Sequence, residues 1–346
     1  MKAVWITGRG GPEVLEVRDV PTPAPGDGEV LVAVRACALN HLDIWVRAGA
    51  RPSFIRPIIP GSDIAGVIHA LGPGVTGPRL GDEVVVFPGF APSALHDRLT
   101  EYDVLRQDFG IIGAQRHGGC AEYVAVPAAN VVPKPAGLSW ETAASVPVTF
   151  VTAWHMLIAR AQVRPGETVL IQSAGSGVSA AGIQIARFAG ARVIATTVGA
   201  AKAERARKLG ADHVLDYRTE DVAARVRELT GDRGVDVVFD HHGAGTWDAN
   251  MKSLARGGRL VFCGTTGGAE VTANLASLYL QAQSLLGSTL GTRAELATVL
   301  DLVARGRLMP IIDRTFPLDR IREAHEYMDD ARRFGKVVML IGQTAA

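Results

Sequence analysis

The 346-residue chain has no long apolar run, since no stretch approaches the roughly 18 consecutive apolar residues of a membrane-spanning helix. Its first residues, MKAVWITG, also lack the apolar core of a signal peptide and predict a strand instead. A net charge of +1 provides no charge excess for binding nucleic acid or an anionic membrane. Cys37, Cys120 and Cys263 are too few and too widely spaced for a disulfide framework. These absences predict a cytoplasmic protein that acts on a small-molecule substrate, with no nucleic acid and no membrane as partner.

The first third of the chain predicts a β-rich domain. Residues 29–37 alternate as a half-buried strand does, and residues 84–87 and 121–126 are two further short apolar segments between turns. Prolines and a glycine at 133–137 predict a linker, and Ser139 predicts the start of a helix. The chain is long enough to form a second domain beyond this linker.

From residue 168 onward, apolar segments of strand length alternate with segments of helical spacing. Units of this kind predict an α/β fold with a parallel sheet covered on both faces. The expected strands are residues 168–172, 192–196, 213–215, 235–240, 259–263 and 285–288, and the expected helices are residues 180–188, 202–209, 221–229 and 251–254. A helix at 295–304 and a closing strand at 336–341 complete the prediction.

A glycine-containing turn joins the first expected strand of this region to its helix. Gly175, Gly177 and Ala180 fit the G-x-G-x-x-G/A dinucleotide fingerprint, in which glycines allow a tight turn and the close approach of a pyrophosphate. The amino end of the helix adds free N–H groups and a positive dipole end. We therefore predict that cofactor phosphates bind over Gly175, Ser176, Gly177 and Val178.

The end of the second expected strand predicts which nicotinamide cofactor is used. Sites that prefer NAD usually place Asp or Glu there to bind the ribose hydroxyls, yet no carboxylate occurs before Glu204. Thr197 and Lys202 instead leave space and positive charge for a 2′-phosphate. A solvated Lys202 without a cofactor role is the competing interpretation. NADP is therefore favoured over NAD.

Several segments together resemble the medium-chain dehydrogenase/reductase superfamily. They are residues 11–15 (GPEVL), 60–66 (PGSDIAG), 81–84 (GDEV), 118–123 (GGCAEY), 209–212 (LGAD) and 334–338 (FGKVV). The resemblance covers the whole chain and implies a GroES-like β-barrel catalytic domain at 1–132 and 292–346. It also implies a doubly wound Rossmann domain at 133–291, an active-site cleft between the two, and a homodimer or homotetramer.

The superfamily contains zinc alcohol dehydrogenases and zinc-free reductases, and the resemblance allows the two to be distinguished. At the positions of the three catalytic zinc ligands this chain carries Asn40, Ser62 and Val148, and Leu42 replaces the hydroxyl of the proton relay. Zinc requires thiolate, imidazole or carboxylate donors, so no catalytic zinc is expected. The four cysteine positions of the structural-zinc lobe are Pro92, Leu95, Arg98 and Arg106, so no structural zinc is expected either.

The zinc-free branch fits better, because Asn40, Asp43, Arg47 and Gly49 match the N-x-x-D-x-x-x-R-x-G pattern of quinone oxidoreductases. This resemblance implies hydride transfer to a quinone, an enone or a related carbonyl or alkene. Asn40, His41 and Asp43 are the expected catalytic residues, with Asn40 or His41 donating a hydrogen bond to the substrate oxygen. The expected positions near the cofactor are Thr152, Gly264, Thr265, Ser288 and Thr289 for the nicotinamide and Tyr217 for the adenosine.

Two other classes remain compatible with the sequence. One is an alcohol dehydrogenase acting on a small alcohol or aldehyde, with zinc held in a displaced site that includes Cys37, His41 and Asp63. The other is a non-catalytic NADPH-binding protein. His241 and His242 resemble a metal pair, but adjacent residues at a strand end point in opposite directions. We expect one of the two near the adenine and ribose instead.

Overall fold

A computed structural model describes residues 1–91 and 105–342. The chain divides into a first unit, Met1–Val151 with Thr292–Gly306 and Pro310–Ala346, and a second unit, Thr152–Gly291 with Arg307–Met309. The first unit continues past residue 133, through α2 (Trp140–Ala144) and most of α3 (Pro147–Trp154).

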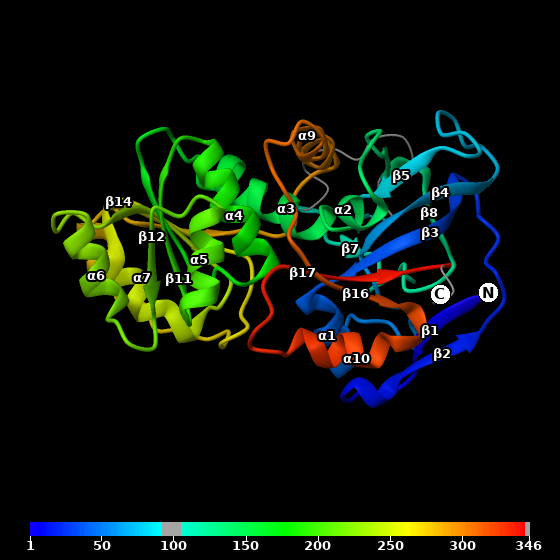
Figure 1. The fold of residues 1–346 in the computed structure, drawn as a ribbon, viewed down its shortest axis with the longest axis horizontal. Helices are drawn as coiled ribbons and strands as arrows, with labels where there is room; N and C mark the ends of the chain where they lie inside the picture. Colours follow the sequence, from blue (N-terminus) through cyan, green and yellow to red (C-terminus); the bar gives the residue numbers. More distant parts are fainter. Residues whose placement is uncertain (92–104, 343–346) are drawn as a thin grey trace. The chain divides into compact units, whose positions relative to one another are not determined.

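The first unit is built on a largely antiparallel seven-stranded sheet with β3 near its centre (Figure 1). β3 pairs with β17, β4 and β8, and the main strand order is β16-β17-β3-β4-β5-β9. This sheet is the predicted β-rich domain. Its strands and those of two small two-stranded sheets are β1 (Lys2–Ile6), β2 (Leu15–Asp19), β3 (Glu29–Leu39), β4 (Asp63–Leu71), β5 (Glu83–Val86), β6 (Gly89–Phe90), β7 (Gly110–Ile111), β8 (Tyr123–Pro127), β9 (Val131–Pro133), β16 (Ile312–Pro317) and β17 (Lys336–Leu340).

The second unit contains a six-stranded sheet in which every neighbouring pair is parallel, in the order β12-β11-β10-β13-β14-β15. All six expected strands are present, so the predicted α/β fold is confirmed. The strands are β10 (Thr168–Ile171), β11 (Arg192–Thr197), β12 (His213–Asp216), β13 (Val235–Asp240), β14 (Leu254–Phe262) and β15 (Ser284–Gly287). The helices are α4 (Gly177–Phe188), α5 (Ala200–Lys208), α6 (Val222–Leu229), α7 (Trp247–Ser253) and α8 (Leu275–Leu280), and a π-helix (His155–Arg160) extends α3.

The strand order of the second unit reverses between β10 and β13. From β10 the chain proceeds outward through β11 to β12, crosses back, and proceeds from β13 through β14 to β15 in the other direction. The carboxyl ends of parallel strands meet at one edge, and ligands of such sheets bind beside the reversal point. The fold therefore places the turn after β10 at the position expected for a dinucleotide.

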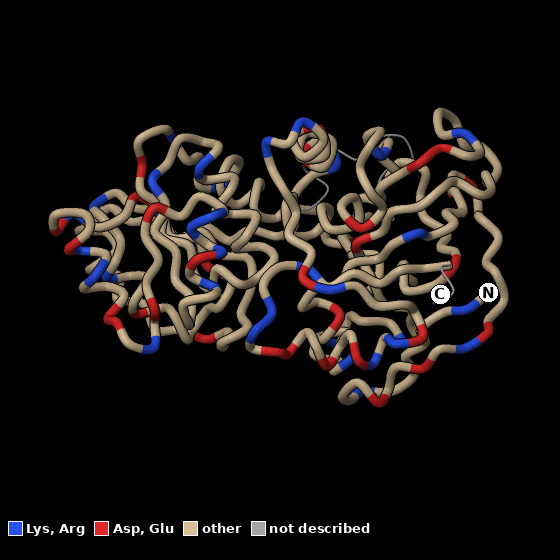
Figure 2. Tube along the Cα trace, viewed as in Figure 1, with Lys and Arg blue, Asp and Glu red and all other residues tan. Residues whose placement is uncertain are grey.

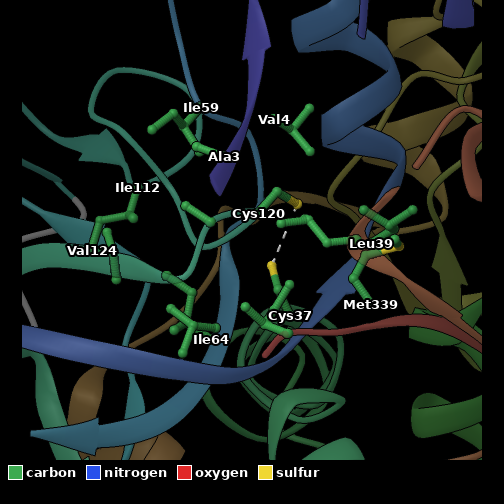
Figure 3. Close-up of a cluster of buried hydrophobic side chains, with 14 of the residues drawn as sticks. Ala3, Val4, Cys37, Leu39, Ile59, Ile64, Ile112, Cys120, Val124 and Met339 are labelled. Atoms are coloured by element: carbon green, nitrogen blue, oxygen red, sulfur yellow. Dashed lines mark hydrogen bonds between the residues drawn. The ribbon is translucent and has the colours of Figure 1, made fainter. Parts of the chain in front are cut away.

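The apolar core of the first unit contains two cysteines. Cys37 on β3 is fully buried, and so is Cys120 (Figure 3). The Cys120 thiol donates a hydrogen bond to the Cys37 sulfur at 3.8 Å, and the two form no disulfide. Gly61 lies directly beside them, because a Cβ at this position would be 2.5 Å from the Cys37 sulfur. This close packing leaves room only for glycine.

Besides α2 and most of α3, the first unit contains α1 (His41–Ala48), α9 (Arg293–Ala304) and α10 (Ile321–Met328). The sequence predicts α9 but gives no expectation for α1 or α10. On α10, burial lowers the pKa of His325 to about 3, and its Nδ1 lies 3.5 Å from Arg47 on α1. His325 is therefore a neutral core residue at physiological pH. Within the described ranges, no helix has the length and apolar character needed to cross a membrane.

Candidate functional site

The expected cofactor residues of the second unit lie at the carboxyl edge of its sheet (Figure 1). The fingerprint turn follows β10, and Thr197 ends β11. Tyr217 follows β12, while Gly264 and Thr265 follow β14, and Ser288 and Thr289 follow β15. Thr152 differs from these, because it is buried within α3 and not at a strand end.

The fingerprint turn begins α4 with a well-formed cap. Ser176 is the N-cap, and its Oγ accepts a hydrogen bond from the backbone N–H of Ser179 at 3.2 Å. The Nε2 of His241, at the end of β13, lies 3.0 Å from Ser176 Oγ and 3.1 Å from Ser179 Oγ. The N–H groups of Gly177 and Val178, in the first turn, have no intrahelical acceptor. They are available to the oxygen atoms of a phosphate.

The tight turn is not made by the glycines that the fingerprint assigns to it. Neither Gly175 nor Gly177 has a positive φ, whereas Ser173 does, at 54°. α4 also lies close to β13 at Gly182, where a Cβ would be 3.3 Å from the ring of Phe239. The sequence motif thus locates the turn correctly, but the conformational roles belong to neighbouring residues.

The outer part of this edge contains the residues expected at a 2′-phosphate. Thr197 pairs in register with Asp216 at the end of β12, and Lys202 lies in the first turn of α5. The carboxylate of Asp216 accepts hydrogen bonds from the N–H groups of Gly199 and Arg218, both at 3.0 Å. These bonds hold the pKa of Asp216 below its usual value. The predicted cofactor preference depends on the end of β11 alone and does not take this carboxylate into account.

The two adjacent histidines after β13 make separate contacts, as their strand-end position predicts. His241 contacts the fingerprint serines, whereas His242 Nδ1 lies 2.9 Å from Thr266 Oγ1. Nearby, Gly264 packs so closely that a Cβ would be 2.8 Å from the carbonyl oxygen of His241. The hydroxyl of Ser288 is buried without a hydrogen-bond partner among the described residues. It is a free polar group at the end of the sheet where the nicotinamide is expected.

The first unit contains a buried polar cluster around Lys336, the first residue of β17. Its ammonium group donates to Leu39 O at 2.8 Å, Asn40 Oδ1 at 2.6 Å and Asp63 Oδ2 at 2.8 Å. Three acceptors match the three N–H donors of a lysine. The side chains of Lys336 and Asp63 are only 4% and 0% exposed. Asp63 also accepts from Asn40 Nδ2 at 2.9 Å and from Val148 N at 2.7 Å.

Asp43 connects this cluster to the loop before β4. Its carboxylate accepts hydrogen bonds from Asn40 N at 2.7 Å and Gly61 N at 2.9 Å. Burial raises the pKa of Asp43 to about 6, although these bonds and the charge of Lys336 favour its ionised form. Asn40 and Asp43, two of the three expected catalytic residues, thus belong to one buried network in which both ends of the Asn40 amide are engaged.

His41, the third expected catalytic residue, lies outside this network. It is the first residue of α1, is exposed, and packs edge-on against Trp45 with ring centroids 5.0 Å apart. Cys37 faces Cys120 in the apolar core instead. The structure does not bring Cys37 and His41 together as a metal-binding pair.

The family resemblance assigns three positions to catalytic zinc ligands, and all three lie beside the carboxylate of Asp63. Asn40 and Val148 donate to it, and Ser62 precedes it in the chain. These residues supply an amide, a hydroxyl and an alkyl group, which do not match the donors that zinc requires. Within the described ranges, no group of three or more His, Cys, Asp or Glu side chains is arranged to bind a metal. Of the expected lobe positions, Pro92, Leu95 and Arg98 lie outside the described residues, and Arg106 is exposed.

Lys336 is a site residue that the local sequence pattern does not identify. Its neighbours FGKVV served only as part of a family resemblance, and its partners Asn40 and Asp63 lie more than 270 positions away. The available signal was a lysine at the start of an otherwise apolar closing strand, because a buried lysine requires several acceptors.

Comparisons with known proteins agree with this architecture. The family described as alcohol dehydrogenase GroES-like domain matches residues 26–136, and the family described as zinc-binding dehydrogenase matches residues 177–305. The quinone oxidoreductase of Homo sapiens is 30% identical, and the match covers 99% of this chain and 98% of that protein.

Two solved structures share the fold over the full chain. An NAD-dependent alcohol dehydrogenase is 46% identical with a TM-score of 0.93, covering 99% of this chain and 100% of that one. The crotonyl-CoA carboxylase/reductase AntE, solved in complex with NADP, is 26% identical with a TM-score of 0.89, covering 100% and 95%.

Proposed function

Because this chain belongs to the medium-chain dehydrogenase/reductase superfamily and is an NAD(P)-dependent oxidoreductase, we propose that it transfers a hydride from NADPH to a quinone, an enone or a related carbonyl or alkene, without a catalytic zinc. The observation that carries the proposal is the Lys336 ammonium. It bonds to Asn40 and Asp63 at the position where a zinc alcohol dehydrogenase would hold its metal.

A zinc ion at this position would be disfavoured for two reasons. The Asn40, Ser62 and Val148 side chains lack thiolate, imidazole and carboxylate donors. The Asp63 carboxylate already accepts hydrogen bonds from Lys336, Asn40 and Val148, and the buried ammonium would repel a second cation. The chemistry proposed here therefore involves no metal.

Binding of NADPH is supported by the carboxyl edge of the second unit. The first-turn N–H groups of Gly177 and Val178 would bind the pyrophosphate, and Lys202 and Tyr217 would bind the 2′-phosphate and adenosine. The cofactor, when bound, supplies the hydride.

The residues of this chain supply positioning and not strong acid–base chemistry. Asn40 has both ends of its amide engaged by Lys336 and Asp63, so it acts as a support. His41 is exposed, and we assign the hydrogen bond to the substrate oxygen to its imidazole. Orientation of the reactants and exclusion of water are then the main sources of rate acceleration.

A substrate panel tests the proposal. Purified protein is expected to oxidise NADPH in the presence of quinones or enones, with kcat/KM for NADPH at least about tenfold above that for NADH, since one charge-assisted contact is worth that much. The same preparation should not oxidise short alcohols with NAD⁺. NADPH binding without turnover of any quinone or enone would instead indicate a non-catalytic protein.

An alcohol dehydrogenase is the second candidate function, favoured by the 46% identity to an NAD-dependent alcohol dehydrogenase. This alternative predicts oxidation of a small alcohol with NAD⁺ and dependence on bound zinc. The panel separates the two, because they differ in substrate, in cofactor and in the effect of a chelator.

We propose that the chain forms a homodimer through α8 and the edge strand β15. This surface carries four of the eight large exposed apolar side chains of the second unit's described residues, namely Leu275, Tyr279, Leu280 and Leu285, which are 73%, 71%, 56% and 39% exposed. Among the described strands, none pairs with the outer side of β15, and an unpaired, apolar edge strand favours pairing with another chain. We also propose a cytoplasmic location, which suits the Cys37 and Cys120 thiols because they form no disulfide.

Replacing Leu275 and Tyr279 together by Glu is expected to convert the dimer to a monomer, because four negative charges would be brought into one apolar contact. Light scattering after size-exclusion chromatography measures the mass directly. Leu80→Glu, at a 64%-exposed leucine of the first unit, is the matched control and should leave the dimer intact. A wild-type monomer, or an unchanged mass in the double variant, would contradict the assignment.

A further inference from the structure

A basic pocket of about 470 Å³ lies at the amino ends of the second unit's strands. The opposite, carboxyl edge of this sheet carries the expected cofactor residues and is called the cofactor edge below. Its walls come from the end of α6, the start of β14 and the region of α8. The lining residues are Arg227, Arg233, Met251, Lys252, Leu254, Arg256, Ser277, Gln281 and Gln283. Four of these side chains are cationic, and none is acidic.

The four cations are not equally occupied by internal partners. Arg233 forms a two-pronged ion pair with Asp236 at 2.7 and 2.8 Å. Arg227 donates only to neutral carbonyl oxygens of Asp232, Lys252 and Leu254. Its positive charge is therefore fixed in place but not neutralised.

Lys252 and Arg256 are exposed, and neither is paired with a carboxylate within the described residues. Elsewhere on the second unit, acidic and basic residues are interspersed along the chain (Figure 2). Like charges around one concave surface repel one another, and a bound anion would relieve that repulsion. Three uncompensated cations around one pocket thus indicate an anion of high charge.

Specific local features of the backbone shape the wall of the pocket. β13 advances from Val235 to Val237 while β14 advances from Leu254 to Arg259, so β14 bulges outward and presents Arg256. The turn before β13 packs tightly against the start of β14, because a Cβ at Gly234 would be 2.6 Å from the carbonyl oxygen of Ser253. A rigid wall of this kind loses little conformational entropy when it binds a ligand.

We propose that the basic pocket binds a small polyphosphate anion, with Lys252, Arg256 and Arg227 neutralising its charge. The hydroxyl of Ser277 and the amides of Gln281 and Gln283 provide neutral donors beside the cations. This site is independent of the proposed hydride transfer, since it lies at the opposite edge of the sheet and shares no residue with the cofactor edge.

Isothermal titration calorimetry with inorganic pyrophosphate tests this site, using the full chain with NADPH present at saturation so that the cofactor edge is filled. Lys252→Gln with Arg256→Gln is expected to weaken pyrophosphate binding about 100-fold, since two charge-assisted contacts are lost and each contributes about a factor of ten. Lys208→Gln with Arg305→Gln removes the same charge from two exposed ion pairs and is the matched control.

The wild type and the control should bind pyrophosphate with equal affinity, more tightly than orthophosphate at equal ionic strength. Both double variants replace exposed side chains, so unchanged thermal unfolding midpoints without anion are expected. Absence of binding to the wild type, or equal weakening in both double variants, would overturn the proposal. Absence of binding would exclude the site, and equal weakening would show that pyrophosphate binding responds to the net charge of the protein alone.

Discussion

Replacing Lys336 by methionine is expected to lower the free energy of unfolding by about 3–5 kcal/mol, the usual cost of removing one partner of a buried ion pair. The variant would leave the Asp63 carboxylate without its cation and Asn40 Oδ1 and Leu39 O without a donor. Methionine is chosen because it retains most of the apolar volume. Urea unfolding at neutral pH measures the loss.

Lys208→Met is the matched control for this prediction. Lys208 and Glu204 also approach to 2.8 Å, but their side chains are 73% and 66% exposed. An exposed pair contributes at most about 1 kcal/mol, so this variant should unfold almost as the wild type does. Equal effects of the two substitutions would show that the Lys336 cluster is not a buried charge network.

The pH dependence of the Lys336→Met effect separates lost charge from lost packing. Lys336 lowers the pKa of Asp43, which burial raises to about 6, so removing the ammonium should raise this pKa further. A carboxyl group whose pKa is raised in the folded state lowers the stability of the fold at pH values above that pKa. This loss of stability disappears as the carboxyl becomes protonated at lower pH. The destabilisation should therefore be larger at pH 8 than at pH 5. A packing defect alone would give the same loss at both values.

Lys202→Gln is expected to raise KM for NADPH about 10- to 100-fold while changing KM for NADH little. A hydrogen bond from a charged donor contributes about 1.5–3 kcal/mol, and only NADPH carries the 2′-phosphate that would receive it. Lys202 lies in the first turn of α5, beside the ends of β11 and β12. Steady-state kinetics with both cofactors measures the change.

Lys208→Gln, in the last turn of the same helix, is the control and should leave both KM values unchanged. A parallel increase in KM for NADPH and NADH in Lys202→Gln would mean that the variant disturbs the common part of the cofactor. In that case the 2′-phosphate would have to be assigned to another residue.

The sequence predicts the strands of the second unit and their carboxyl edge well, because the signals involved are local. Each strand of the second unit is a short apolar segment, and parallel pairing then brings their carboxyl ends together without further information. The details within the turn are less predictable. Ser173 adopts the positive φ that the motif assigns to a glycine, because the surrounding structure outweighs the residue's own preference.

The buried cluster of the first unit could be predicted only in part. Asn40 and Asp43 were recognised from a pattern within a few residues of each other, but Lys336 and Asp63 meet across β17, β3 and β4. Long-range pairing of this kind leaves no periodic signal in the sequence. The role assigned to Asn40 changes as a result, since its amide is saturated by groups that the local pattern does not contain.

The most direct test of the account is the NADPH-dependent reduction of a quinone or enone, measured before and after treatment with a zinc chelator on protein whose metal content has been determined. The account predicts substantially less than one zinc per chain and an unchanged turnover number after chelation. About one tightly bound zinc per chain, with activity lost on chelation and restored by added zinc, would contradict it.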